Sequence, residues 1–151
     1  MKLSKKIIAF ASLLVWGFSF PVTADVEYLS SPAVKELNLP FSEAVRVDNV
    51  LYLSGQVGNL PGKMQLVEGG IKAETRQTLD NIRATLNRYG AKMDDLVKCT
   101  IFLADIDEWP SMNEVYKTYF EENYPARSAV AGSGLALGAR VEIECIAHLG
   151  Q

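Results

Sequence analysis

The chain has 151 residues, with 15 Lys and Arg against 18 Asp and Glu and a formal charge of −3. Residues 1–24 hold three lysines and no acidic side chain, so the remaining 127 residues carry 12 basic and 18 acidic side chains and a formal charge of −6. An acidic chain of this length fits one domain, and it lacks the basic footprint that binding to nucleic-acid phosphates requires.

The first 24 residues have the layout of a secretory signal peptide. Lys2, Lys5 and Lys6 precede an apolar run over residues 7–20, and PVTA then offers small residues for cleavage after Ala24. The run is shorter than the roughly 20 residues of a membrane-spanning helix, which disfavours a retained anchor. We therefore expect cleavage and export to the bacterial periplasm or outside the cell. A single domain over residues 25–151, free of the membrane, would remain.

The first half of this domain shows a hairpin followed by a helix. Alternating runs at 45–47 and 50–53 flank an Asp48-Asn49 turn, which predicts two antiparallel strands. Apolar residues then recur at helical spacing and precede Gly90, a typical residue after a helix end: Leu79, Ile82, Leu86 and Tyr89.

The second half predicts strand, helix, strand, strand. LVKCTIFLAD is typical of a buried strand, a second helix follows Pro110 and ends before Pro125, and ARSAVAGSG and RVEIECIAHL are two further strands. This order predicts an α+β fold with one mixed sheet and two helices packed on one face. The other face carries apolar residues, so we expect an oligomer that buries it.

Cys99 and Cys145 lie in the middle of two predicted strands. In an oxidising compartment they could form a disulfide that closes a loop of 46 residues. Two buried free thiols, which behave as small apolar side chains, are the alternative. The sequence leaves this choice open.

Arg127, in NYPARSAV, and Glu142, in the last strand, are the main candidates for chemistry. On neighbouring strands they could form a partly buried ion pair. Alternatively, Arg127 binds the carboxylate of a small ligand through its planar N–H groups while Glu142 holds or deprotonates a water.

Three further polar positions and the single histidine complete the candidates. Ser54 and Gly55 end a hairpin strand, where glycine marks either a close ligand approach or a bulge. Asn113 could cap the second helix or face a cleft. His148 is expected at the surface, and one histidine excludes a paired-histidine nuclease.

PARSAV and VEIECIA, with the spacing from Arg127 to Glu142, resemble the C-terminal signature of the RidA/YjgF family of enamine/imine deaminases. The resemblance covers nearly all of residues 25–151. It implies a chorismate-mutase-like subunit in a homotrimer, with clefts at the subunit interfaces. It also implies hydrolysis of 2-aminoacrylate-type enamines and 2-imino acids to 2-ketoacids and ammonia without a metal or organic cofactor. Arg127 would bind the substrate carboxylate, Glu142 would position the water, and Ser54, Gly55 and Asn113 would line the pocket.

Two pocket positions depart from the family pattern. Phe41 stands where many deaminases have Tyr, and Ala129 stands where they often have Cys. Both changes make the pocket less polar, so activity could be slower or directed to a bulkier imino acid. A trimer that binds carboxylates without turnover, or that acts as a chaperone, is the alternative function. The endoribonuclease activity described for some relatives fits poorly with the acidic chain.

Overall fold

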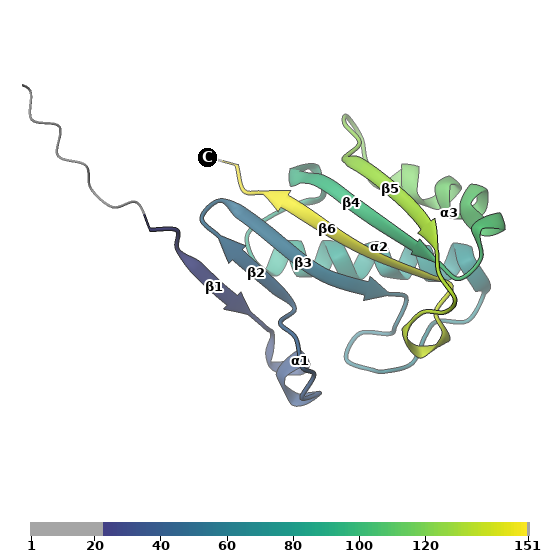
Figure 1. Ribbon diagram of the computed structural model, residues 1–151, viewed down its shortest axis with the longest axis horizontal. Coiled ribbons are helices and arrows are strands. Elements are labelled where there is room, and N and C mark those ends of the chain that lie inside the picture. The colour runs from purple at the N-terminus through teal and green to yellow at the C-terminus, as the bar shows by residue number, and fades with distance from the viewer. Residues whose placement is uncertain (1–22, 151) are drawn as a thin grey trace, which may run out of the picture.

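The computed structural model describes residues 23–150, which form six strands and three α-helices (Figure 1). The strands are β1 (Val26–Leu29), β2 (Ala44–Val47), β3 (Val50–Val57), β4 (Leu96–Leu103), β5 (Ala126–Ala131) and β6 (Val141–His148). The helices are α1 (Pro32–Glu36), α2 (Gly70–Arg88) and α3 (Trp109–Tyr116). Residues 1–22 of the expected signal peptide lie outside the described part of the chain.

The strands form one mixed sheet in the order β1-β2-β3-β6-β4-β5. All neighbouring pairs are antiparallel except β4 and β5. The predicted hairpin is β2–β3, and Asp48 in its turn has a positive φ of 49°. Asp and Asn tolerate this conformation better than most residues, so the turn chemistry agrees with the fold.

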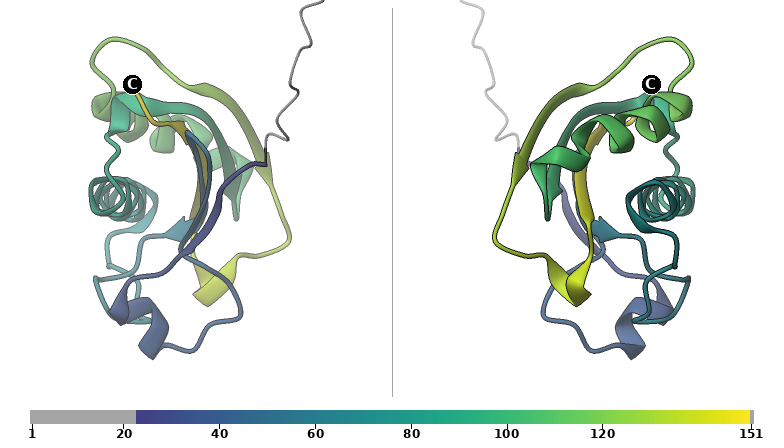
Figure 2. Two further views of the ribbon diagram at one scale, coloured as in Figure 1. Left: turned by 90° about the vertical axis from the view of Figure 1, so that its left-hand side faces the viewer. Right: turned by 90° about the vertical axis from the view of Figure 1, so that its right-hand side faces the viewer.

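Helices α2 and α3 pack on the same face of the sheet, as Figure 2 shows edge-on. The predicted α+β class, with two helices on one face, is therefore confirmed. The buried positions of α2 recur at helical spacing and face the sheet, and Gly90 follows the helix with a positive φ of 81°. Within residues 23–150, none of the helices combines the length and apolar character needed to cross a bilayer.

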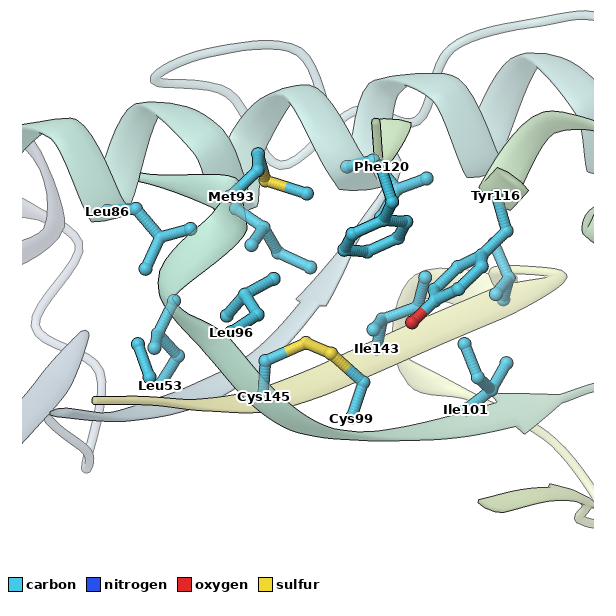
Figure 3. Packing of buried hydrophobic residues seen from close by; sticks show 14 of the residues in the cluster. Leu53, Leu86, Met93, Leu96, Cys99, Ile101, Tyr116, Phe120, Ile143 and Cys145 are labelled. Atoms are coloured by element: carbon cyan, nitrogen blue, oxygen red, sulfur yellow. A yellow bond between two sulfur atoms is a disulfide. The ribbon is translucent and has the colours of Figure 1, made fainter. Parts of the chain in front are cut away.

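Cys99 and Cys145 form a disulfide in the core between the sheet and the helices (Figure 3). They lie directly opposite each other on β4 and β6, and both are almost fully buried. The sequence left open whether these cysteines are free thiols or form a disulfide, and in the structure they form the disulfide. The same row continues onto β5, where Arg127 lies opposite Cys99.

No helix from residues 23–150 covers the other face of the sheet (Figure 2). This face exposes large apolar side chains from several strands. Register pairs place them together on this side: Val26, Tyr28, Tyr52 and Val130. This is the apolar face that the prediction of an oligomer requires.

Candidate active site

Glu142 projects from the uncovered face of β6, since its neighbours Val141 and Ile143 point into the core and are fully buried. Its carboxylate lies against the backbone of Gly55 on the adjacent strand β3. A Cβ atom at position 55 would come within 2.1 Å of Glu142 Oε1, so any side chain there would displace the carboxylate. The β3–β6 register also shifts between Leu53 and Gln56, which marks a bulge at this point.

Glu142, Gly55 and Phe41 line one cavity of about 390 Å³, which we call the Glu142 cavity. Much of its remaining wall is apolar and includes Met64 and Leu137. Burial in this setting, and secondarily the charge of Glu144, raises the pKa of Glu142 above the ordinary value of a glutamate. Within residues 23–150 the Glu142 carboxylate has no hydrogen bond and no ion pair, so it is free to hold a water.

Ser54, unlike its neighbour Gly55, makes hydrogen bonds within the chain and does not line the cavity. Its hydroxyl donates a 2.7 Å hydrogen bond to the carbonyl of Ser42, and its backbone N–H donates to the carbonyl of Glu43 at 3.1 Å. The residue is not part of the wall of the Glu142 cavity. In this structure Ser54 joins β3 to the segment that carries Phe41, one residue before Ser42.

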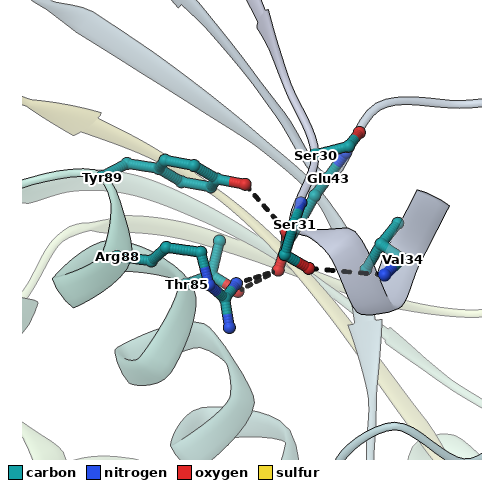
Figure 4. Close-up of polar contacts among 7 residues, drawn as sticks. All are labelled: Ser30, Ser31, Val34, Glu43, Thr85, Arg88 and Tyr89. Atoms are coloured by element: carbon teal, nitrogen blue, oxygen red, sulfur yellow. Dashed lines mark hydrogen bonds and ion pairs between the residues drawn. The ribbon is translucent and has the colours of Figure 1, made fainter. Parts of the chain in front are cut away.

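Glu43 is a buried carboxylate that the sequence did not single out (Figure 4). It accepts hydrogen bonds from the Ser31 N–H (3.0 Å), the Tyr89 hydroxyl (2.8 Å) and the Thr85 hydroxyl (3.2 Å), and it pairs with the Arg88 guanidinium. Burial alone would raise the pKa of Glu43, but these hydrogen bonds and the charge of Arg88 lower it overall. The network ties the start of β2, and the Phe41 segment before it, to the end of α2.

Arg127 lies on β5 and points toward the helices, as does Cys99 in the same row. Its guanidinium carbon is 4.6 Å from the ring centroid of Tyr116 and 6.0 Å from that of Trp109. It has no hydrogen bond or ion pair to any residue between 23 and 150. Its N–H groups are therefore available to an anion that the chain itself does not provide.

Two cavities flank the Arg127 side chain. Asn113 and Tyr116 help to line the first, of about 330 Å³, which we call the Arg127 cavity. Ala129 and Trp109 line the second, of about 300 Å³. The candidate residues thus fall into two groups, with Phe41, Gly55 and Glu142 in one place and Asn113, Arg127 and Ala129 in another.

The expectation that Arg127 and Glu142 occupy neighbouring strands is wrong. Strand β4 lies between β5 and β6, which at about 4.8 Å per strand separates them by roughly 10 Å. Arg127 also shares its sheet face with Cys99, whereas Glu142 lies opposite Phe102 on the other face. An internal ion pair between the two residues is excluded, because they project from opposite sides of the sheet.

The other sequence candidates are placed as follows. Asn113 lies within α3 and faces the Arg127 cavity, while the helix begins at Trp109 with Pro110 in its first turn, so Asn113 is not its cap. His148 is exposed at the end of β6, as expected. A buried carboxylate such as Glu43 could have been suspected from its place at the start of a strand, but its side-chain partners Thr85, Arg88 and Tyr89 lie more than 40 residues away, at the end of α2.

The chain is similar to known proteins in sequence and in fold. A family model described as "Endoribonuclease L-PSP" matches residues 33–149. A human protein named 2-iminobutanoate/2-iminopropanoate deaminase is 44% identical over 111 residues, which cover 74% of this chain and 81% of the relative. A protein of the same name from Dermatophagoides farinae is 41% identical over 118 residues, covering 78% and 92% of the two chains. The crystal structure of RidA from the Antarctic bacterium Psychrobacter sp. PAMC 21119 matches with a TM-score of 0.71 at 35% identity, covering 85% and 100%.

Proposed function

The chain belongs to the RidA/YjgF family, which the endoribonuclease L-PSP model describes, and we propose that it is a hydrolytic deaminase of small enamines and 2-imino acids. The products are the corresponding 2-ketoacid and ammonia. Relatives that are 41–46% identical and carry the name of this activity support the reaction class.

The observation that carries the proposal is the unpaired Glu142 carboxylate against the backbone of Gly55. Its raised pKa makes it a better proton acceptor than an ordinary glutamate, as a general base requires. Glu142 takes a proton from water as the water oxygen bonds to the imine carbon, and returns it to the nitrogen to give an adduct that carries OH and NH2 on one carbon. Glu142 then moves the remaining hydroxyl proton to the nitrogen, so that the C–N bond breaks, ammonia leaves and the ketoacid carbonyl forms.

Arg127 supplies the second half of the site. A guanidinium binds a carboxylate through two parallel charge-assisted hydrogen bonds, and Arg127 has no competing anion within residues 23–150. Asn113, which lines the same cavity, can add an amide hydrogen bond to the substrate. We assign Arg127 to the substrate carboxylate and Glu142 to the attacking water.

A homotrimer reconciles this assignment with the opposite sheet faces. Arg127 of one subunit would meet Glu142 of its neighbour, and the uncovered apolar face would be buried in the assembly. Exposed apolar side chains rim the cavities at both residues: Phe41 and Leu137 beside Glu142, and Tyr124 and Trp109 beside Arg127. Association of subunits would cover them. Light scattering on residues 25–151 tests the assembly, and a monomer would contradict it.

We also propose export, after cleavage of residues 1–24, to the periplasm or the cell exterior. The pattern of the N-terminal sequence supports it, and so does the buried Cys99–Cys145 disulfide, because structural disulfides persist in oxidising compartments. N-terminal sequencing of the protein from a periplasmic fraction tests the assignment. A mature chain that retains residues 1–24 would reject it.

The deaminase proposal is tested by hydrolysis of 2-iminopropionate, generated in situ by an amino acid oxidase. Residues 25–151 should accelerate hydrolysis over buffer, and Glu142→Gln and Arg127→Ala should each remove most of the acceleration. Glu68→Gln is the control, because Glu68 is exposed and lines neither the Glu142 cavity nor the cavities beside Arg127. No acceleration by folded, assembled protein would reject the deaminase and favour carboxylate binding without turnover.

A further inference from the structure

Two aromatic rings of α3 are the neighbours of the Arg127 guanidinium, and no polar partner from residues 23–150 competes with them. We propose that Trp109 and Tyr116 are positioning residues that hold this guanidinium for the incoming carboxylate. The inference rests on the proposed role of Arg127 in substrate binding, and it adds a function for two aromatic residues of α3.

The placement of the two rings follows from helix geometry. Trp109 and Tyr116 are the first and last residues of α3, seven positions apart, so they lie on the same side of the helix two turns from each other. The Arg127 guanidinium carbon lies over both rings, at 4.6 Å from the Tyr116 centroid and 6.0 Å from the Trp109 centroid. A cation over an aromatic face is attracted by the electron density of the ring, and the attraction strengthens where water is excluded.

Tyr116 is held rigidly and acts through its ring. The residue is 3% exposed, and its ring packs on Phe120 with centroids 4.9 Å apart. Burial raises the pKa of Tyr116 to about 12, although the charge of Arg127 opposes the shift, so the phenol is neutral at physiological pH. Its hydroxyl has no hydrogen-bond partner within the described residues. The contact with Arg127 is therefore between a cation and a ring face, and Phe can reproduce it.

The two rings accept no hydrogen bond from the Arg127 guanidinium, so its N–H groups stay available to a carboxylate. The N–H groups that bind a carboxylate lie in the guanidinium plane, whereas cation–π contacts use the face of that plane. Holding a long side chain in its binding conformation before the ligand arrives lowers the entropy lost on binding. Loss of a ring should therefore weaken substrate binding and leave the chemical step at Glu142 nearly unchanged.

The test compares steady-state constants for 2-iminopropionate in four variants. Trp109→Leu and Tyr116→Leu should each raise KM about three- to tenfold with kcat within about twofold of wild type, the pattern of lost uniform binding. Tyr116→Phe should restore the wild-type KM. Wild-type KM in the leucine variants, or an equal loss in Tyr116→Phe, would overturn the proposal. If Tyr116→Leu fails to fold, Trp109→Leu decides alone, because Trp109 is 42% exposed.

Arg127→Ala, the fourth variant, separates this inference from the proposed function. An unchanged kcat/KM in Arg127→Ala would reject Arg127 as the carboxylate site altogether. Loss of hydrolysis in Arg127→Ala, together with normal KM values in the leucine variants, would reject only the positioning role.

Fluorescence gives a readout that does not depend on turnover. The chain has two tryptophans, and Trp109 is the one that remains in residues 25–151. Titration with pyruvate, a 2-ketoacid product, should change the Trp109 emission saturably in wild type and not in Arg127→Ala. The midpoint should rise about three- to tenfold in Tyr116→Leu. Constant emission at pyruvate concentrations that inhibit turnover would overturn the placement of Trp109 beside the binding group.

Discussion

Subunit complementation provides the sharpest test of how the site is built. Arg127 and Glu142 lie on opposite faces of the sheet with β4 between their strands, so one chain cannot bring both to the same substrate. We expect Arg127→Ala and Glu142→Gln to be inactive alone and partly active when mixed. A native site needs Arg127 from one subunit and Glu142 from its neighbour. In a random 1:1 mixture each is intact with a chance of one half, so about a quarter of the sites are native.

The assay unfolds both variants together in urea without a reductant, so that the Cys99–Cys145 disulfide stays closed, and then refolds them. Hydrolysis of 2-iminopropionate should reach about a quarter of the rate of wild type refolded in the same way. Each variant refolded alone, and the two mixed after refolding, are the controls. A co-refolded trimer that remains as inactive as its parents would refute the shared site, because it would place Arg127 and Glu142 of the same chain in one site.

Three further predictions concern stability, measured by urea unfolding at a fixed protomer concentration. Glu142→Gln should stabilise the protein at pH 7. Because burial raises the folded-state pKa of Glu142, stability present below the ordinary glutamate pKa of about 4.3 is lost as the pH rises through the folded value. Glu43→Gln should cost about 2 kcal/mol at pH 7, and the difference from wild type should shrink as the pH falls through the lowered folded-state pKa of Glu43. Replacing Cys99 and Cys145 together by Ala should cost about 4 kcal/mol, the chain-entropy value for a 46-residue separation.

Each of these predictions has a contrary outcome. Equal stability of Glu142→Gln and wild type at pH 7 would show that the Glu142 carboxylate is fully solvated. A Glu43→Gln difference that persists unchanged into acid would assign the loss to packing instead of charge. For the cysteines, a reductant should destabilise wild type and leave the double variant unaffected. If the reductant destabilised wild type and the double variant equally, the loss of stability would not come from the disulfide.

The sequence predicted those elements whose pattern repeats locally. The β2–β3 hairpin, α2 and β4 follow from alternation, helical spacing and turn residues that need no distant partner. The short β1 and α1 were missed because their residues are mostly exposed and leave no periodic apolar signal. The strand order was also missed, because pairing strands next to each other in sequence is the usual case and β6 instead inserts between β3 and β4.

The candidate site was predicted in its parts but not in its arrangement. Arg127 and Glu142 could be singled out because a charged side chain in an apolar strand is costly to bury unless a partner or a ligand compensates its charge. Their division between two sheet faces depends on the strand order, which local patterns do not contain. Glu43 was overlooked because its partners Thr85, Arg88 and Tyr89 come from the far end of α2, and only the folded chain brings them together.

The Cys99–Cys145 bridge also bears on how the protein withstands oxidants. Oxidases that make imines from amino acids with O2 as the electron acceptor release hydrogen peroxide, and exposed thiolates are susceptible to its attack. Both cysteines of the chain are already joined and buried. The sulfur left open to attack on the described surface is the thioether of Met64, at the wall of the Glu142 cavity. A deaminase built in this way can work beside a peroxide-producing oxidase without losing a cysteine to sulfenic acid.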